Sequence, residues 1–209
     1  MPASRGVSLS VFAHWPNRIT ALRFVGAFVL FGLLTVIGDG DPRNSSGLMQ
    51  FSFWLFVVVA STDFLDGYLA RRDNLTSTFG RIADPFVDKV LILGVLVYLA
   101  VLPWSRPWVP AWAVVLILAR EFLVTGIRGW VESTGREFGA DRLGKVKMVL
   151  QSIAVGGILF LHAFPWPEEV FPYLSWMAHA LILGTIAITV ISGASYVLKT
   201  RTLVEEIKS

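Results

Sequence analysis

Four aspartates lie in two short segments that combine carboxylates with glycine and alanine. The segments are residues 63–71, Asp63-Phe-Leu-Asp66-Gly67-Tyr-Leu-Ala70-Arg71, and residues 80–88, Gly80-Arg-Ile-Ala-Asp84-Pro-Phe-Val-Asp88. On a helix, where successive residues are about 100° apart, the carboxylates of each segment share one face with its smallest residues. Two antiparallel helices that face each other through these stripes would bring the four carboxylates together. The glycines and the alanine would leave room for a flat ligand or a close backbone.

Four converging carboxylates repel one another strongly unless a cation lies between them. Ligands that are all oxygen atoms suit a hard cation, so we expect Mg²⁺ or Mn²⁺. A pair of such ions suits displacement at phosphorus, because it stabilises both the attacking and the leaving oxygen. The pattern therefore predicts metal-dependent chemistry at a phosphorus atom.

A competing interpretation is that the same aspartates form separate salt bridges. The pairs would be Asp63 and Asp66 with Arg71 and Arg72, and Asp88 with Lys89 or Arg81. Salt bridges alone would not need glycines on the carboxylate faces, which favours the metal site.

Pro85, between the last two aspartates, leaves a second alternative open. Proline is tolerated in the first turn of a helix. If the helix begins earlier, the missing N–H frees a backbone carbonyl that can serve as an extra ligand.

The elements that must hold these aspartates in place are apolar. Of the 209 residues, 55% are hydrophobic and 16% are charged, against about 45–50% and about 25% in a soluble globular chain. The mean hydropathy of +0.65 agrees with a membrane protein. A net charge of +3 without a basic run argues against nucleic acid as a partner, and the lack of cysteine excludes disulfides and thiolate metal sites.

Six segments are long and apolar enough for membrane-spanning helices, which need about 20 mostly apolar residues. They are residues 18–37, 48–70, 82–102, 108–128, 147–165 and 172–198, separated by segments rich in proline and glycine. No internal repeat or long linker divides them. We therefore expect an all-α fold in which residues 1–209 form a single domain, an integral membrane bundle of six transmembrane helices.

The distribution of positive charge orients this bundle, because cytoplasmic loops carry an excess of lysine and arginine. Fifteen basic residues lie in one set of loops and ends, two (Arg43 and Arg106) lie in the other set, and Arg120 lies within the fourth span. Both termini are therefore expected in the cytoplasm. This places the protein in the cell inner (cytoplasmic) membrane as a multi-pass protein.

The polar residues of five spans collect at the same cytoplasmic end. Charges at membrane depth are costly and tend to be functional. We therefore expect a site that is open to the cytoplasm and sunk partly into the bilayer. An ion or proton transporter is the alternative from a different class, but it should carry charges near the midplane of several spans.

The pattern Asp-x2-Asp-Gly-x2-Ala-Arg-x8-Gly-x3-Asp-x3-Asp at residues 63–88 resembles the signature of the CDP-alcohol phosphotransferases, with all eight residues matched. Three further segments resemble the bacterial phosphatidylglycerophosphate synthases of this family. They are Asn17-Arg-Ile-Thr20-Ala-Leu-Arg23, Ala119-Arg120-Glu121 with Arg128, and Gly144-Lys145-Val-Lys147. Residues 129–143 and the C-terminus carry no recognisable motif.

The resemblance implies a role for each signature residue. Asp63, Asp66, Asp84 and Asp88 would hold two metal ions, and Asp88 would also be the general base that takes the proton of the acceptor hydroxyl. The cytidine diphosphate would be seated by Asn17, Asp66, Gly67, Ala70, Arg71 and Thr78. Arginine suits this role because its guanidinium can pair with a phosphate through two hydrogen bonds.

The resemblance also implies the substrates, CDP-diacylglycerol and sn-glycerol 3-phosphate, and a homodimer. Phosphatidylglycerol, inositol phosphate and serine are the alternative acceptors. A phosphorylated acceptor needs positive charge that the diphosphate has not already used. The cytoplasmic cations that remain near the site are Arg120, Arg128, Lys145 and Lys147. The alternatives are that Arg120 forms an ion pair with Glu121 that orients the fourth span, and that the other three are ordinary positive-inside anchors.

Overall fold

The computed structural model describes the backbone of residues 15–73, 78–135 and 142–208, and the side chains of residues 18–62, 86–135 and 143–201. Within these ranges the chain is helical and contains no strand. The elements are α1 (Trp15–Ile37), the short 3-10 helix η2 (Pro42–Ser45), α2 (Ser46–Asp73), α3 (Thr78–Val101), α4 (Ala111–Ser133), α5 (Arg142–Ala163) and α6 (Phe171–Lys208). The all-α prediction is therefore confirmed.

Each predicted span coincides with one long helix, although the ends differ. The fourth helix begins at Ala111, after the Pro107 and Pro110 breakers, and the fifth ends at Ala163, before Pro165. Among the residues that the structure describes, four segments are long and apolar enough to cross a membrane: Arg18–Ile37, Pro42–Thr62, Leu143–Ala163 and Phe171–Arg201. These four spans agree with a multi-pass membrane protein.

The fourth helix, α4, differs from those four because it carries charge in its interior. Arg120, Glu121 and Arg128 lie within a single stretch of 18 residues, from Ala111 to Arg128. Arg120 and Glu121 are both buried, each with 8% of its surface exposed. In α3, side chains are described only from Phe86 onwards.

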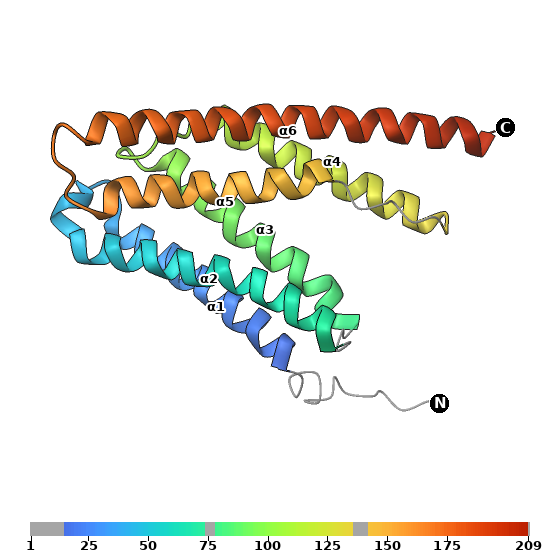
Figure 1. Cartoon of the computed structure of the whole chain (residues 1–209), viewed down its shortest axis with the longest axis horizontal. Helices are drawn as coiled ribbons and strands as arrows, with labels where there is room; N and C mark the ends of the chain where they lie inside the picture. Colours follow the sequence, from blue (N-terminus) through green and yellow to red (C-terminus); the bar gives the residue numbers. More distant parts are fainter. Residues whose placement is uncertain (1–14, 74–77, 136–141, 209) are drawn as a thin grey trace.

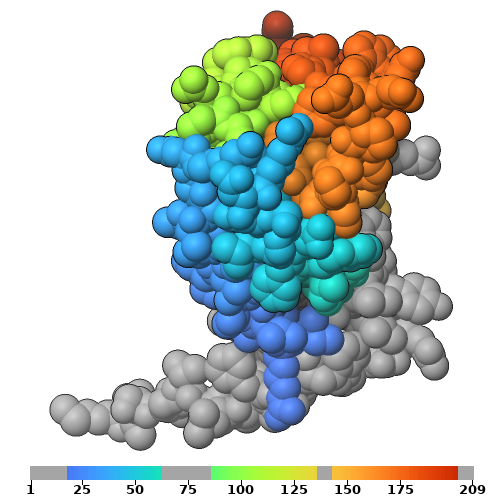
Figure 2. All heavy atoms as spheres, turned by 90° about the vertical axis from the view of Figure 1, so that its left-hand side faces the viewer, coloured from blue at the N-terminus to red at the C-terminus, as the bar shows by residue number. Residues whose placement is uncertain are grey.

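The helices are arranged as a bundle that spreads towards one end. In Figure 1, α1, α2 and α3 diverge from α6 towards the end where α1 begins and α6 ends. The most extensive packing is between α5 and α6 and between α1 and its neighbours α2 and α3. Figure 2 looks onto the opposite end, where the connections between successive helix pairs gather. The end that spreads is the end at which the predicted site residues lie.

Apolar side chains occupy both the inside and the outside of this bundle. Leu30, Leu34 and Leu99 are completely buried. At the same time large apolar side chains such as Phe122 and Trp176 are mostly exposed, at 72% and 73%. A helix that is hydrophobic all round is buried or membrane-spanning, so lipid is the environment that these outer faces fit.

Aromatic residues at the outer end do more than face lipid. The ring of His162 lies 4.9 Å from that of Trp104 and 5.0 Å from that of Trp108. The Trp104 indole N–H donates to the Gly38 carbonyl at 3.1 Å, and that of Trp108 donates to Ser175 at 3.1 Å. These tryptophans therefore link the helix connections, whereas Trp176 remains exposed as a lipid anchor would.

Gly94 of α3 lies directly against the Phe31 ring of α1. A Cβ atom at this position would lie 2.2 Å from the Phe31 ring. That ring also stacks on Tyr98, with centroids 5.6 Å apart. The glycine is thus required for the two helices to pack against each other at this depth.

We predict that Gly94→Ala destabilises the bundle, because overpacking a close contact costs about 1–3 kcal/mol. Thermal unfolding of the purified protein in detergent measures the effect. Gly32→Ala is the matched control, since a Cβ there has no neighbour within 4 Å among the described residues. A melting temperature for Gly94→Ala equal to that of Gly32→Ala would contradict this packing.

Candidate active site

The predicted aspartates lie where α2 ends and α3 begins. Asp63 and Asp66 belong to the last turns of α2, Asp84 to the first part of α3, and Asp88 follows one turn later. The helices run in opposite directions, as predicted, and are separated only by residues 74–77. Several predicted site residues have side chains outside the described ranges: Asn17, Asp63, Asp66, Gly67, Ala70, Arg71, Thr78 and Asp84. Their convergence therefore stays a prediction.

Asp88 is the one signature aspartate whose side chain is described, and an arginine from α1 holds it. Arg23 donates from Nη1 to Asp88 Oδ1 at 2.6 Å, and from Nε to Thr62 Oγ1 on α2 at 3.3 Å. The Arg23 side chain is almost fully buried, while that of Asp88 is 19% exposed. The carboxylate thus lies at the edge of the protein interior, positioned by a buried cation that joins three helices.

The salt-bridge interpretation paired Asp88 with Lys89 or Arg81, and the described contacts differ from it. Lys89 instead extends towards α4, where its ammonium donates to Thr125 Oγ1 at 2.7 Å. Neighbouring residues on a helix point about 100° apart, so Asp88 contacts α1 and Lys89 contacts α4. The side chain of Arg81 lies outside the described ranges.

Pro85 lies inside α3, because the helix already begins at Thr78. Proline has no N–H, so it cannot donate to the carbonyl of Arg81 one turn earlier. Of the two alternatives for Pro85, the structure has the earlier helix start. A backbone carbonyl without its usual helical donor is therefore part of the segment between the last two aspartates.

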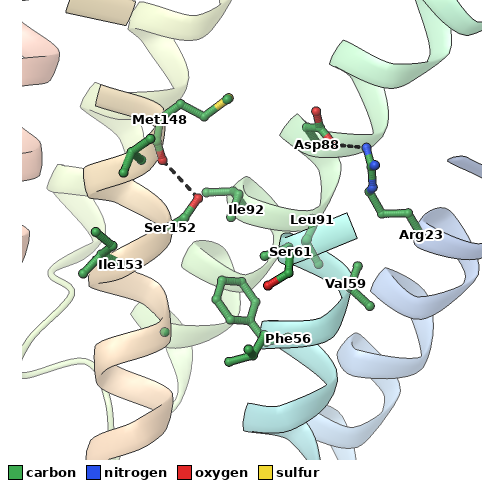
Figure 3. Close-up of a pocket in the computed structure, with 14 residues that line it drawn as sticks. Arg23, Phe56, Val59, Ser61, Asp88, Leu91, Ile92, Met148, Ser152 and Ile153 are labelled. Carbon is green, nitrogen blue, oxygen red and sulfur yellow. Dashed lines mark hydrogen bonds and ion pairs between the residues drawn. The ribbon is translucent and has the colours of Figure 1, made fainter. Parts of the chain in front are cut away.

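A cavity of about 260 Å³ extends from the Arg23–Asp88 pair between α1, α2, α3 and α5. Figure 3 shows the charged pair at one end of the cavity and Phe56 towards the other. The remaining lining is mostly apolar and includes Leu91, Ile92 and Ile153. The cavity therefore joins a polar end near the aspartates to an apolar interior.

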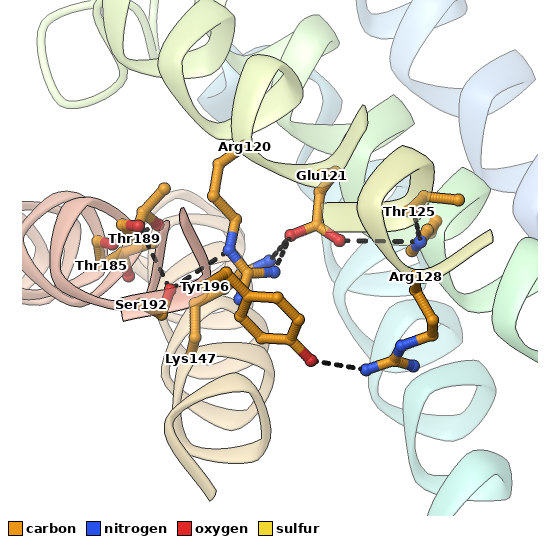
Figure 4. Close-up of polar contacts among 10 residues, drawn as sticks. Arg120, Glu121, Thr125, Arg128, Lys147, Thr185, Thr189, Ser192 and Tyr196 are labelled. Carbon is orange, nitrogen blue, oxygen red and sulfur yellow. Dashed lines mark hydrogen bonds and ion pairs between the residues drawn. The ribbon is translucent and has the colours of Figure 1, made fainter. Parts of the chain in front are cut away.

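A second polar cluster surrounds Glu121 on α4. Its Oε1 atom accepts a hydrogen bond from Arg120 Nη1 at 2.8 Å and another from the ammonium of Lys147 on α5. Its Oε2 atom lies 3.9 Å from the ammonium of Lys89 on α3. One carboxylate thus faces three cations, which leaves a formal charge of +2 within the cluster. Figure 4 shows these side chains converging from different helices.

The C-terminal helix α6 completes this cluster. Ser192 Oγ accepts a hydrogen bond from Arg120 Nε at 3.1 Å. Tyr196, which is 1% exposed, accepts one from Arg128 Nη2 through its hydroxyl at 2.7 Å. The Arg120 guanidinium also lies 5.7 Å from the centre of the Tyr196 ring. Both arginines of α4 are therefore anchored on α6.

Three of the four predicted acceptor residues are involved in these contacts. Arg120 and Lys147 meet on Glu121, and Arg128 lies beside them on Tyr196. Lys145 is exposed on α5. The proposed ion pair of Arg120 with Glu121 is present, and it extends to Lys147 instead of orienting α4 alone. These contacts leave the binding of an acceptor phosphate untested.

The predicted site residues did not include Arg23, Glu121, Ser192 or Tyr196. Arg23 carried a signal, because it is a charge inside an otherwise apolar span. Glu121 carried one too, but its contacts with α5 and α3 depend on the tertiary fold. Nothing in the sequence pointed to Ser192 or Tyr196, since hydroxyl residues are common in membrane helices. Gln151, one turn from Lys147, has a buried Nε2 with no hydrogen-bond partner among the described residues.

The described part of the chain contains no group of three or more residues that could hold a metal ion. Asp88 is the only predicted ligand within that part. Its contact with Arg23 is compatible with a metal, because an ionised carboxylate has two oxygens and about four acceptor positions. The oxygen donors expected around it suit Mg²⁺ or Mn²⁺, which remains the predicted cofactor.

Comparison with known proteins covers most of the chain. A family model described as CDP-alcohol phosphatidyltransferase matches residues 13–194. Three relatives bear the name CDP-diacylglycerol–glycerol-3-phosphate 3-phosphatidyltransferase. The protein from Bacillus subtilis (strain 168) is 38% identical, and the match covers 87% of this chain and 92% of that protein. Those from Rickettsia felis and Rickettsia bellii are 36% and 35% identical, over 87% and 90% of this chain and 92% and 96% of theirs. The chain therefore belongs to the CDP-alcohol phosphatidyltransferase family.

Proposed function

We propose that this protein transfers the phosphatidyl group of CDP-diacylglycerol to sn-glycerol 3-phosphate, which gives phosphatidylglycerophosphate and CMP in phospholipid synthesis. The observation that carries this proposal is the similarity, over most of the chain, to several relatives named for that reaction. The complete eight-residue signature at positions 63–88 supports the same chemistry.

The reaction is a displacement at phosphorus. The acceptor hydroxyl oxygen forms a bond to the phosphatidyl phosphorus, the bond from that phosphorus to the CMP oxygen breaks, and the hydroxyl proton passes to Asp88. Asp63, Asp66, Asp84 and Asp88 would hold two Mg²⁺ or Mn²⁺ ions. When bound, these ions would neutralise the diphosphate and stabilise the departing CMP.

Arg23 supports the role of Asp88 by fixing the orientation of its carboxylate. The guanidinium bonds Oδ1 at 2.6 Å and is itself buried between α1, α2 and α3. A positioned base within hydrogen-bond reach of its proton is the first requirement of general base catalysis. We propose that the cytidine diphosphate is seated by Asn17, Asp66, Gly67, Ala70, Arg71 and Thr78.

The cavity beside Asp88 suits the lipid part of the donor. Its apolar lining between α2, α3 and α5 matches an acyl chain, and its charged end lies at the reacting diphosphate. Burial of each CH₂ group contributes about 0.8 kcal/mol, so even part of one chain would anchor the donor. The cavity thereby aligns a membrane lipid with a polar site.

The Glu121 cluster suits the phosphate of the acceptor. Its formal charge of +2 would balance the charge of a phosphate monoester, which is nearly −2 at neutral pH. Arg120, Arg128, Lys145 and Lys147 are proposed to form this pocket. Serine has no phosphate and inositol phosphate is wider, so both are expected to be poorer acceptors.

The membrane setting belongs to the same proposal. Six spans with both termini in the cytoplasm would place the aspartates and the Glu121 cluster at the cytoplasmic ends of the helices. Soluble glycerol 3-phosphate and a lipid from the inner membrane can meet there. A homodimer is proposed from the family resemblance alone.

The first prediction from this proposal is strict metal dependence. EDTA should abolish CMP release, and Mg²⁺ or Mn²⁺ should restore it, because four carboxylates cannot converge on a diphosphate without cations. Release of CMP is followed in detergent with glycerol 3-phosphate as acceptor. Full activity in metal-free buffer would contradict the two-metal mechanism.

The second prediction concerns Asp88→Asn. Turnover should fall at least about 10²-fold, the lower end of what a general base contributes. The asparagine oxygen can still accept the Arg23 hydrogen bond, so the variant should fold. Turnover and melting temperature are both measured, with Asp39→Asn at the outer end as control. A purified, folded variant with more than about a tenth of the rate would exclude Asp88 as the base.

The third prediction is that Lys147→Met weakens acceptor binding selectively. One charge-assisted hydrogen bond contributes about 1.5–3 kcal/mol, so the KM for glycerol 3-phosphate should rise roughly 10- to 100-fold. The KM for CDP-diacylglycerol should change little. Methionine preserves most of the buried side-chain volume while removing the charge.

Arg106→Ala is the control for Lys147→Met, because it removes a positive charge at the outer end of the bundle. Its two KM values should equal those of the wild type. If Lys147→Met raised both KM values equally, its effect would be on the fold and not on the acceptor. If serine were used better than glycerol 3-phosphate by the wild type, the proposed acceptor would be wrong.

A further inference from the structure

The inner face of α6 carries a line of buried hydroxyl groups within the apolar part of the helix. Thr185, Thr189, Ser192 and Tyr196 follow one another at helical spacing and are at most 1% exposed. The first three hydroxyls donate to carbonyls of their own helix, at 2.6–3.1 Å. Tyr196 is different, because its ring carries the hydroxyl away from α6 to Arg128 on α4 (Figure 4).

The same tyrosine contacts both arginines of α4, at different parts of its side chain. The hydroxyl accepts from Arg128 Nη2 at 2.7 Å, and the ring lies under the Arg120 guanidinium at 5.7 Å. One helical turn before Tyr196, Ser192 accepts a hydrogen bond from Arg120 Nε. Gly193 makes the approach possible, since a Cβ there would lie only 3.3 Å from Arg120 Cγ.

These contacts leave a defined set of donors for a ligand. A guanidinium has five N–H donors in a fixed fork. Arg128 uses a donor on Tyr196, yet the residue as a whole is exposed. An arginine that is already held in one orientation loses less conformational freedom when a phosphate binds to its remaining donors.

We propose that Tyr196 is a positioning residue for the acceptor, which holds Arg128 through its hydroxyl and Arg120 through its ring so that both can bind the acceptor phosphate. This inference rests on the proposed function, because it assigns the recognition of a phosphate monoester to the two arginines. It gives α6 a part in substrate specificity, although none of its side chains is proposed to touch the substrate.

Tyr196→Phe separates the two contacts, because it removes the hydroxyl and keeps the ring. The KM for glycerol 3-phosphate should rise about 3- to 10-fold, the size of one net hydrogen bond. The turnover number at saturating acceptor and the KM for CDP-diacylglycerol should stay unchanged. Ser192→Ala, which releases Arg120 Nε, is a second variant and should raise the same KM.

Tyr98→Phe is the matched control. Its hydroxyl also makes a hydrogen bond between helices, to Thr35 Oγ1 at 2.9 Å, but far from the cluster in the α1–α3 interface. It should affect the melting temperature in detergent and leave the acceptor KM unchanged. A purely structural role for Tyr196 would make the two variants behave alike.

A double-mutant cycle with Arg128→Ala gives the decisive test. If Tyr196 acts through Arg128, adding Tyr196→Phe to Arg128→Ala should raise the acceptor KM no further. Two results would overturn the inference and leave the proposed function intact. One is that the effects of the two substitutions on the acceptor KM are fully additive. The other is that Arg128→Ala raises the acceptor KM while Tyr196→Phe leaves it normal. A wild-type protein that does not use glycerol 3-phosphate would overturn both.

Discussion

The fold depends on one buried carboxylate. Glu121 receives Arg120 from its own helix and Lys147 from α5, lies 3.9 Å from Lys89 of α3, and is linked through Arg120 to Ser192 of α6. Removing one member of a buried ionic group leaves its partners uncompensated, at a cost of about 3–5 kcal/mol. Since apolar contacts between membrane helices and contacts with lipid are similar in kind, these polar contacts specify which helices meet.

A further buried cation, Arg23, connects a different set of helices in the same way. It ties α1 to Asp88 of α3 and to Thr62 of α2. The two clusters lie on different faces of α3, because the consecutive residues Asp88 and Lys89 point about 100° apart and contact different neighbours. One helix therefore fixes the proposed base relative to the proposed acceptor pocket.

The sequence was sufficient for the fold class and for the approximate position of every long helix, because apolar length and proline breakers are local signals. It also identified Arg120, Arg128, Lys145 and Lys147 as a group, since they are the cytoplasmic cations that the diphosphate leaves unused, and it offered Glu121 as a partner of Arg120. The other partners were not predictable. Whether Arg128 meets Tyr196 depends on how α4 and α6 pack, and tyrosine is an ordinary residue near the end of a membrane helix. Likewise, the helix start before Pro85 depends on residues whose propensity allows either outcome.

The separation of the two clusters has a consequence for how a lipid and a soluble substrate can share one site. The donor must approach from the bilayer, and the apolar cavity beside Asp88 lies between α2, α3 and α5. The acceptor is charged and must approach from water, where the cations around Glu121 and Tyr196 lie between α3, α4, α5 and α6. Among the described residues, α3 and α5 are the helices that border both. A displacement at phosphorus requires the two substrates to meet in line, and these two shared helices are the part of the bundle that can impose that alignment. The polar groups that anchor α3 and α5 are therefore as important to the reaction geometry as the residues that contact the substrates.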